Sequence, residues 1–375
     1  MKIDPLQTQQ VYRKNKGFLE SIHIDGWLLF GVLLLLATSI AIVYSASGGD
    51  EAVMTRQIIR IGFALTLMLL FAQIPPNILY IFTPWLFLIG IIMLISVLLF
   101  GQVSKGAQRW LDIGPVRFQP SELMKLVLPM TIAWLFAHSK FPPSFGLLVL
   151  GATLIAFTGS LIVVQPDLGT SLLIGLSGLS VLFFAGLPWK VIFTAFAGIL
   201  LSAPIAWHFM HAYQKQRVLT FLTPESDPLG SGYHIIQSKI AIGSGGIDGK
   251  GYMGSTQAHL EFLPESTTDF IFSVLAEEFG LLGVIGLLIL YSFVIARGLY
   301  IALKAQDNFT RLIAASFMMT LFVYIFVNIG MVSGLLPVVG LPLPLMSYGG
   351  SSLVTLMISF GILMSIHTHK KLLTK

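Results

Sequence analysis

The chain has 375 residues, of which 55% are hydrophobic and only 10% charged, and its mean hydropathy is +0.85. Soluble proteins carry about 25% charged residues, so this composition excludes a soluble, disordered or coiled-coil protein and indicates one that crosses a membrane many times. Cysteine is absent, which excludes disulfides, thiolate metal sites and a cysteine nucleophile.

Runs without charged residues predict the membrane spans, because a bilayer core of about 30 Å needs roughly 20 apolar residues per helix. We predict ten transmembrane helices at 26–46, 56–73, 79–100, 121–138, 146–165, 170–186, 189–210, 269–297, 310–332 and 346–366. The second, fourth and eighth contain charged residues, so hydropathy supports them least. The predicted fold class is an all-α polytopic membrane protein, with one domain over 1–375.

Basic residues in both tails predict the orientation. Four lie in 1–25, which lacks the apolar run of a cleaved signal, and three lie in 367–375. Basic residues gather on the cytoplasmic side, so both tails are expected in the cytoplasm. The connections 101–120 and 211–268 then face outwards. The second is a large extracytoplasmic loop between the seventh and eighth helices.

The first outer loop and the helix after it contain candidate anion ligands. Arg109 carries a planar, permanently charged group that suits phosphate oxygens. Trp110 could stack on a sugar, although an anchor at the membrane interface is the ordinary role of a lone tryptophan. Ser121 is expected to cap the fourth helix with Glu122 in its first turn. Lys125, one turn deeper, has no such structural explanation.

The large loop adds cations and a glycine-rich segment. Its basic residues include Lys215, Arg217, Lys239 and Lys250. The segment 245–251 resembles a phosphate-binding loop, but Ser244 and Gly251 stand where that motif requires glycine and Ser/Thr, so nucleotide binding is not expected. Nucleic acid is not an expected partner, because the charges are few and dispersed.

Three acidic residues, Glu261, Glu265 and Asp269, lie just before and at the start of the eighth helix. Ser266, Thr267 or Thr268 is expected to cap this helix, with Asp269 in its first turn. The helix dipole favours the carboxylate, whereas burial raises a carboxyl pKa. A carboxylate between these influences at the membrane–water boundary could act as a general base. An ordinary acid at a helix end is the alternative.

Glu277 and Glu278 follow Asp269 by about two helical turns, or about 12 Å. Acidic residues at this depth are costly and usually face a cavity or a partner. Their candidate partners are Arg60 and Lys125. A purely structural charge cluster is the alternative to a functional pair.

Taken together, these segments resemble the SEDS family (shape, elongation, division and sporulation), and most closely its elongation members. The resemblance covers nearly the whole chain. The matching segments are 104–111, 118–125, 165–170, 227–234, 243–251, 262–280, 335–340 and 346–352.

The resemblance implies a peptidoglycan glycosyltransferase that polymerises lipid II on the outer face of the bacterial inner membrane during rod-shaped elongation. By this resemblance, Asp269 would deprotonate the 4-hydroxyl of the acceptor GlcNAc, with Glu261 as a supporting acid. The hydroxyl oxygen would attack C1 of the lipid-linked MurNAc with inversion, and undecaprenyl pyrophosphate would leave. The substrate-binding candidates are Lys105, Arg109, Trp110, Lys125, Arg217 and Lys239, of which Lys105, Arg109 and Lys125 are expected at the pyrophosphate.

Partners and alternatives follow from the same resemblance. It implies lipid II, the growing glycan strand, a class B penicillin-binding protein transpeptidase and other elongation-complex proteins as partners. Mg²⁺ or Mn²⁺ would suit the pyrophosphate, but the sequence contains no dedicated metal cage, so no cofactor is firmly expected. A lipid II flippase with a site near mid-membrane and a non-catalytic scaffold of the elongation complex are the alternative functions.

Overall fold

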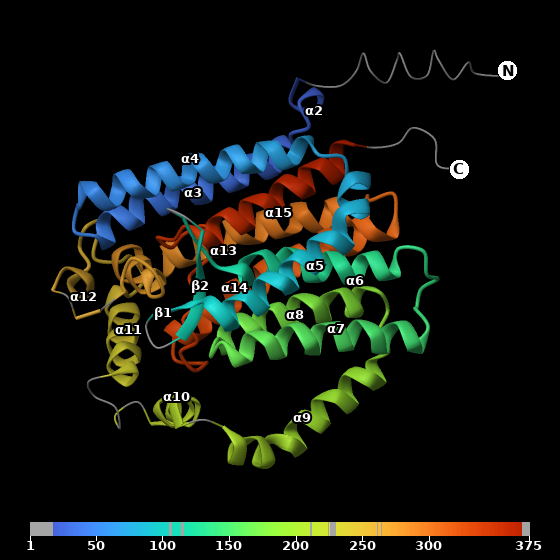
Figure 1. Cartoon of the computed structure of the whole chain (residues 1–375). Helices are drawn as coiled ribbons and strands as arrows, with labels where there is room; N and C mark the ends of the chain where they lie inside the picture. The colour runs from blue at the N-terminus through green and yellow to red at the C-terminus, as the bar shows by residue number, and fades with distance from the viewer. Residues whose placement is uncertain are drawn as a thin grey trace.

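The computed structural model describes residues 18–104, 107–113, 116–210, 212–223, 225, 230–260, 262–263 and 265–369. Long helices cross the molecule from one end to the other (Figure 1). The short helix α2 (Phe18–Ser21) and the end of the last helix lie at one end, and short helices and strands gather at the other.

Within the described residues, ten long helices coincide with the ten predicted spans. They are α3 (Gly26–Ala46), α4 (Glu51–Gln73), α5 (Pro76–Phe100), α6 (Pro120–Phe136), α7 (Phe145–Val164), α8 (Leu168–Phe184), α9 (Trp189–Phe209), α13 (Ile271–Leu303), α14 (Asn308–Val332) and α15 (Ser351–Thr368). Seven of them, α3, α4, α5, α7, α13, α14 and α15, are long and apolar enough to cross a membrane. The helical, polytopic membrane character is confirmed, whereas the count of ten spans stays a prediction.

Aspartates outside the apolar runs fix where several helices begin. The carboxylate of Asp25 accepts a hydrogen bond from the Leu28 N–H at 2.8 Å and begins α3. Asp50, Asp167 and Asp307 cap α4, α8 and α14 in the same way. A charged cap satisfies a free N–H at the helix start and complements the helix dipole.

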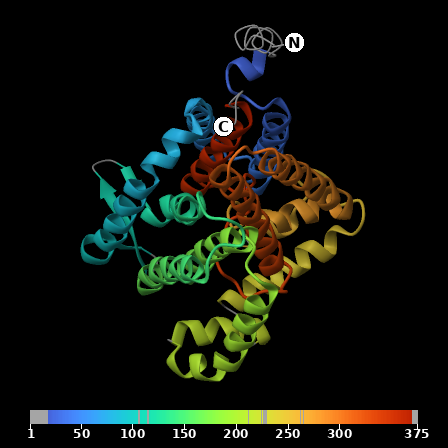
Figure 2. The ribbon, with the colours of Figure 1, turned by 90° about the vertical axis from the view of Figure 1, so that its right-hand side faces the viewer.

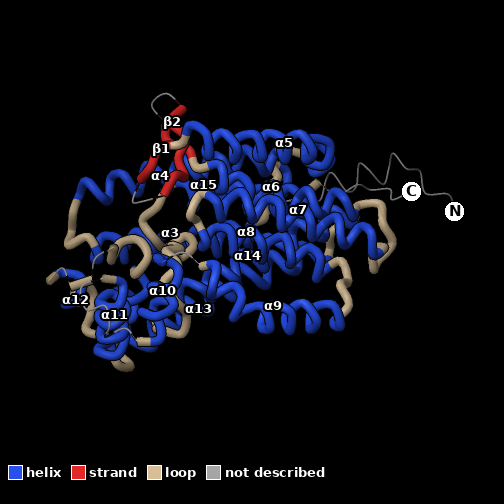
Figure 3. Tube along the Cα trace, turned by 60° about the horizontal axis from the view of Figure 1, so that its bottom comes forward, coloured by secondary structure: helices blue, strands red, loops and turns tan. Residues whose placement is uncertain are grey.

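Helices α14 and α15 form the centre of the bundle. In the apolar 18-residue stretch of each of these two helices, 72% is buried inside the protein, compared with 22% of the corresponding stretch of α4. Figure 2 shows α15, in red, at the middle of the bundle. By contrast, α9 stands apart from the other long helices in Figures 1 and 3. Its Trp189, Phe193 and Leu201 are 64–79% exposed, as expected for side chains that face lipid.

The two outer connections contain more regular structure than the sequence predicted. Residues 101–120 fold into three antiparallel strands, β1 (Gln102–Ser104), β2 (Ala107–Ile113) and β3 (Val116–Phe118), in the order β1-β2-β3. The 211–268 connection contains α10 (Ala212–Leu222), α11 (Ser231–Gly245) and α12 (Thr256–His259). Figure 3 shows the strands and these helices at the same end of the bundle.

Helix α13 is broken at Gly280, whose φ of 60° and ψ of −158° are not helical. The glycine-rich segment 246–251 enters the break. The N–H groups of Lys250 and Gly251 donate to the carbonyls of Glu277 and Glu278 at 3.0 and 2.9 Å. On the far side of the break, the Leu281 and Leu282 N–H groups donate to the carbonyls of Gly246 and Ile247. The glycines therefore allow a close backbone contact, which is a structural role consistent with the weak match to a phosphate-binding loop.

Candidate functional site

Asp269 lies in a turn formed by residues 265–270, and not inside a helix. The N–H groups of Thr268 and Phe270 donate to the carbonyl of Glu265, which has a φ of 58°. Helix α13 begins at Ile271 after Phe270, with no side-chain cap. The prediction that Ser266, Thr267 or Thr268 caps a helix containing Asp269 is therefore wrong, because this turn comes first.

Three side-chain or backbone groups from the C-terminal part of the chain hold this turn. Asn328 of α14 is fully buried, and its Nδ2 donates to the carbonyls of Asp269 and Leu341 at 2.9 and 2.7 Å. The Ser347 hydroxyl donates to the Thr268 carbonyl at 2.6 Å, and the Tyr348 N–H donates to the Thr267 carbonyl at 2.8 Å. The backbone around Asp269 is thus fixed by α14 and by the segment that leads into α15.

The Asp269 side chain is half-buried and points towards Gly340. A Cβ added at Gly340 would lie 3.5 Å from the Asp269 Oδ2, and Gly340 has a φ of 75°. The carboxylate therefore lies against a bend that favours glycine. This geometry leaves a polar carboxylate at a fixed position beside the 334–340 segment.

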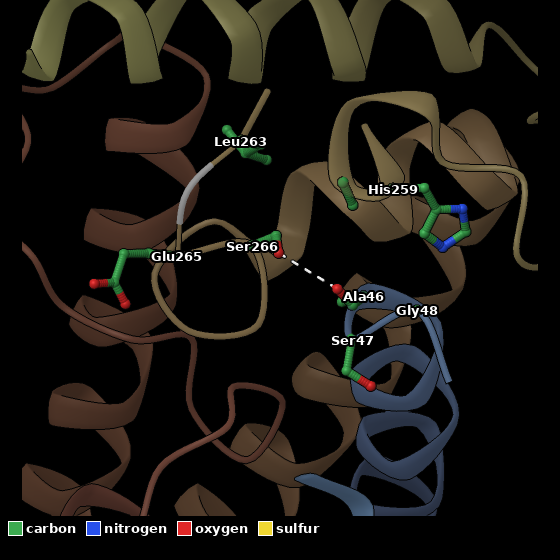
Figure 4. A pocket seen from close by; sticks show the side chains of 8 residues that line it. Ala46, Ser47, Gly48, His259, Leu263, Glu265 and Ser266 are labelled. Atoms are coloured by element: carbon green, nitrogen blue, oxygen red, sulfur yellow. Dashed lines mark hydrogen bonds between the residues drawn. The ribbon is translucent and has the colours of Figure 1, made fainter. Parts of the chain in front are cut away.

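A polar groove of about 500 Å³ lies beside the same turn (Figure 4). The C-terminal end of α3 forms one wall, and residues 258, 259, 263, 265 and 266 form the other. The lining residues are Ala46, Ser47, Gly48, Ala258, His259, Leu263, Glu265 and Ser266. The Ser266 hydroxyl donates to the Ala46 carbonyl at 3.4 Å, the contact drawn in Figure 4. Hydroxyl, imidazole and carboxylate groups in one groove suit a ligand rich in hydroxyls, such as a sugar.

Arg109, a predicted pyrophosphate ligand, contacts the turn between α7 and α8. Its Nη2 donates to the Pro166 carbonyl at 2.7 Å, and its Nε lies 3.4 Å from the Asp167 Oδ2. Gln119 donates to the same Asp167 oxygen at 3.3 Å. The Arg109 guanidinium therefore has a structural partner within the protein. Its predicted contact with substrate stays a prediction.

Lys125, the second predicted pyrophosphate ligand, is buried at 5% exposure. Its Nζ donates to the Glu122 carboxylate at 2.6 Å and to the Tyr324 hydroxyl at 2.5 Å. The second Glu122 oxygen accepts a hydrogen bond from Thr355 at 3.1 Å. This network joins α6, α14 and α15. It gives Lys125 the structural explanation that the sequence lacked.

Helix α6 begins at Pro120 after Gln119, and proline favours the first helical position. The prediction that Ser121 caps this helix is therefore wrong.

The remaining predicted site residues are distributed as follows. Lys239 is exposed on α11, and a Cβ at Gly334 would lie 3.4 Å from its Nζ. Lys239 and Asp269 therefore border the same segment, 334–340. Trp110 is half-buried in β2. Arg217 lies in α10, but its side chain is outside the described part of the structure, as are residues Lys105 and Glu261.

The acidic pair in α13 has partners that the sequence did not predict. The Glu277 carboxylate is fully buried and accepts hydrogen bonds from Lys250 and Ser255, both at 2.6 Å. Glu278 accepts a hydrogen bond from Ser45. The prediction that Arg60 and Lys125 pair with these acids is wrong, because the segment that enters the break in α13 supplies Lys250 and Ser255.

Sequence reasoning missed one contributor to this region, Asn328, and it assigned Arg60 to an acid and not to the Tyr348 ring. The signal for Asn328 was an amide within an otherwise apolar helix.

The cofactor prediction concerned a divalent metal ion. The described residues bring together no group of three or more His, Asp or Glu side chains suited to a metal ion. Mg²⁺ or Mn²⁺ at the pyrophosphate stays a prediction.

Comparison with known proteins identifies the family. The FtsW/RodA/SpoVE family of cell cycle proteins matches residues 20–372. This chain belongs to that family. The peptidoglycan glycosyltransferase MrdB of Escherichia coli K12 is 54% identical over 361 residues, which cover 96% of this chain and 98% of MrdB. The probable peptidoglycan glycosyltransferase FtsW of a Synechocystis strain is 37% identical, covering 91% of this chain and 86% of that protein.

Solved structures support the same fold. The rod shape determining protein RodA of Thermus thermophilus superimposes with a TM-score of 0.70 at 29% identity, covering 92% of this chain and 98% of RodA. A second match is a chain from a peptidoglycan synthase complex that coordinates polymerization and crosslinking. It superimposes with a TM-score of 0.80 at 33% identity, covering 92% of this chain and 97% of that chain. The FtsW/RodA/SpoVE family is the SEDS family, so the predicted resemblance to the SEDS family is confirmed.

Proposed function

We propose that this chain is a peptidoglycan glycosyltransferase that polymerises lipid II into β-1,4-linked glycan strands during elongation of rod-shaped cells. The observation that carries the proposal is the fixed turn that holds the Asp269 carboxylate against the bend at Gly340, next to a polar groove lined by Glu265 and Ser266 of the same turn. It occurs in a chain 54% identical, over nearly its full length, to a peptidoglycan glycosyltransferase.

The chemistry needs one base and one leaving group. Asp269 takes the proton from the 4-hydroxyl of the acceptor sugar, and the hydroxyl oxygen attacks C1 of the donor sugar on the opposite side from the pyrophosphate. The bond from C1 to the pyrophosphate oxygen breaks, its electron pair stays on that oxygen, and undecaprenyl pyrophosphate leaves with inversion. Holding the base on a fixed backbone lowers the entropic cost of this step.

The predicted accessory residues remain part of the proposal. Glu261 is the supporting acid. The substrate-binding set is Lys105, Arg109, Trp110, Lys125, Arg217 and Lys239. The groove beside Ser47, His259 and Ser266 is a candidate site for a sugar ring, since these side chains can donate to and accept from hydroxyl groups. A divalent cation would add charge neutralisation at the pyrophosphate.

The proposed setting is the bacterial inner membrane, with both tails in the cytoplasm and the Asp269 end outside. A class B penicillin-binding protein is the proposed partner, together with other proteins of the elongation complex. This proposal is supported by the similarity to a chain from a peptidoglycan synthase complex that coordinates polymerization and crosslinking.

The experiment is polymerisation of lipid II by the purified chain in lipid vesicles without nucleotide. The wild type should make glycan strands, and Asp269→Asn should reduce the rate by about 10²- to 10⁴-fold, the usual contribution of a general base. Asp307→Asn is the matched control, because Asp307 caps α14 and asparagine caps nearly as well. Full activity of Asp269→Asn would contradict the assignment of the base. Movement of lipid II across the vesicle without polymer would favour the flippase, and inactivity without a partner synthase would favour the scaffold.

A further inference from the structure

Arg60 is a half-buried cation in the middle of α4. It lies nine residues beyond Glu51, or about 14 Å along the helix. Among the described residues, ion pairs connect Arg109, Lys125, Lys250 and other cations to acids, and none of these pairs includes Arg60. A permanently charged side chain at this depth is costly, and it usually marks a functional path.

Two short contacts connect Arg60 to the turn that carries Asp269. The guanidinium carbon of Arg60 lies 4.3 Å from the centre of the Tyr348 ring. The Tyr348 N–H donates to the Thr267 carbonyl at 2.8 Å, two residues before Asp269. Tyr348 therefore connects the cation to the turn that carries the proposed base. The two functional groups border one region of the molecule, although they belong to segments more than 200 residues apart in the sequence.

The start of α15 lies beside the same guanidinium. A Cβ added at Gly350 would lie 3.7 Å from the Arg60 Nε. Gly350 is also the N-cap of α15, and it provides no side-chain hydrogen bond. The positive end of an 18-residue helix therefore adds to the charge of Arg60. Both features favour a negatively charged group at this place.

Two of the three cations first expected at the pyrophosphate, Lys125 and Arg109, are already neutralised by acids. Lys125 is paired with Glu122, and Arg109 lies 3.4 Å from Asp167. Moving either cation to a substrate would leave a carboxylate without its partner at 8% side-chain exposure in both cases, which is costly. Arg60 needs no such exchange, because its described contact is with an aromatic ring.

We propose that Arg60 binds the diphosphate of the lipid-linked substrate and holds it while the bond to the sugar breaks. This inference rests on the proposed function. As the bond from C1 to the diphosphate oxygen breaks, its electron pair stays on that oxygen, and the N–H groups of Arg60 donate to the growing negative charge. The proton of the acceptor hydroxyl goes to Asp269. The planar guanidinium suits two phosphate oxygens, and Tyr348 fixes its orientation.

The test measures lipid II polymerisation by the full chain in vesicles, with Arg60→Gln as the main variant. This variant should raise the KM for lipid II about tenfold, the loss expected for a charge-assisted hydrogen bond. It should also weaken inhibition by farnesyl diphosphate by a similar factor and leave inhibition by farnesol unchanged. A similar weakening for inorganic pyrophosphate would indicate recognition of the diphosphate without its lipid.

Arg311→Gln is the matched control. Arg311 also lies over an aromatic ring, Phe141 at 5.1 Å, but near the start of α14. It should leave both the KM and the inhibition unchanged. If Arg60→Gln does not yield folded protein by gel filtration, Arg60→Lys replaces it and should raise the KM several-fold, because the forked geometry is lost.

The possible results separate this inference from the proposed function. A wild type that makes no glycan strands from lipid II would contradict both the proposed function and the Arg60 inference. An active wild type combined with an Arg60 variant of unchanged KM and unchanged diphosphate inhibition would overturn the Arg60 inference alone. An equal loss in Arg311→Gln would also overturn it, since the effect would then reflect a general loss of arginine–aromatic contacts.

Discussion

At the scale of single residues, the amide of Asn328 connects α14 to the two segments that meet at Asp269. It donates to the carbonyls of Asp269 and Leu341, and it is fully buried. We expect Asn328→Leu to leave both carbonyls without these donors, at a cost of about 1–3 kcal/mol for each buried group. The variant should lower both the thermal stability in detergent and the rate of polymerisation per folded molecule.

Asn308→Leu is the control for this prediction. Asn308 also donates to two carbonyls, those of Ala137 and Ser139, at 3.3 and 3.4 Å, but at the start of α14. It should lower stability at most and preserve the rate per folded molecule. Equal losses of rate in the two variants would show that the Asn328 contact has no special effect on Asp269.

Gly340 gives a second prediction at this scale. Alanine would have to adopt a φ of 75°, and its Cβ would lie 3.5 Å from the Asp269 Oδ2. We expect Gly340→Ala to shift the bend beside the carboxylate and to lower kcat about tenfold, since small misplacements of a catalytic group are costly. Gly186→Ala has a φ of 94° and an ordinary contact with Pro142, so it should cost stability without lowering kcat. Unchanged kcat in Gly340→Ala would argue against a tight fit between this bend and Asp269.

The candidate residues could be found from the sequence, but their partners could not. Asp269 stood out as an acid before an apolar helix, and Lys125 as a cation within one. Their partners Asn328 and Tyr324 come from a distant helix that only tertiary packing brings near. Arg60 was expected to meet an acid, because an ion pair is the usual solution for a buried cation, but it lies on the Tyr348 ring.

At the scale of elements, the break in α13 depends on glycines in two segments. A Cβ at Gly249 would lie 2.1 Å from the Glu278 carbonyl oxygen, and Gly280 has a φ of 60°. We expect Gly249→Ala to prevent this close backbone contact and to destabilise the protein by several kcal/mol or abolish folding, as large steric and strain effects do. The measurement is yield and thermal unfolding in detergent.

Gly243→Ala provides the comparison within the same stretch. Gly243 lies in α11, and a Cβ there would meet nothing within 4 Å. Alanine favours a helix over glycine, so this variant should be as stable as the wild type or more so. If Gly249→Ala were equally well tolerated, the segment 246–251 could not be essential for the break.

Elements with long charge-free runs were predictable, whereas short ones were not. The predicted spans 26–46 and 310–332 differ from α3 and α14 by no more than two residues at either end. The strands at 102–118 were missed because β1 and β3 have only three residues each, too few to show an alternating pattern. The start of α13 was misplaced because the turn before it depends on a left-handed backbone at Glu265.

At the scale of the whole molecule, α15 connects the Asp269 region to an ionic cluster at the other end of the bundle. Its 18 residues span about 27 Å. At its far end His367 lies 3.3 Å from the Asp25 carboxylate, which also accepts hydrogen bonds from Arg297 at 2.6 and 3.1 Å. Asp25 thus joins the start of α3 to the later parts of α13 and α15.

This cluster gives a prediction about pH. Burial raises the pKa of Asp25, but hydrogen bonds from Arg297 and the Leu28 N–H, with the charges of Arg297 and His367, outweigh burial and leave the pKa below its ordinary value of 3.8. A lowered folded pKa means that the carboxylate stabilises the fold above about pH 4, and that this contribution is lost as the pH falls through the folded value. Asp25→Asn keeps a helix cap but loses the charge. It should therefore unfold at a lower temperature than the wild type at pH 7, and this difference should shrink as the pH falls below 3.8.

Asp50→Asn separates this ionic effect from helix capping. Asp50 caps α4 through the Ala52 and Val53 N–H groups, so asparagine should replace it with little change in the unfolding temperature at either pH. Thermal unfolding of the three proteins in detergent across this pH range provides the measurement. A difference between Asp25→Asn and the wild type that stayed constant with pH would show that the carboxylate charge does not hold these helices together. In that case, the link between the two ends of the bundle would depend on apolar packing along α15.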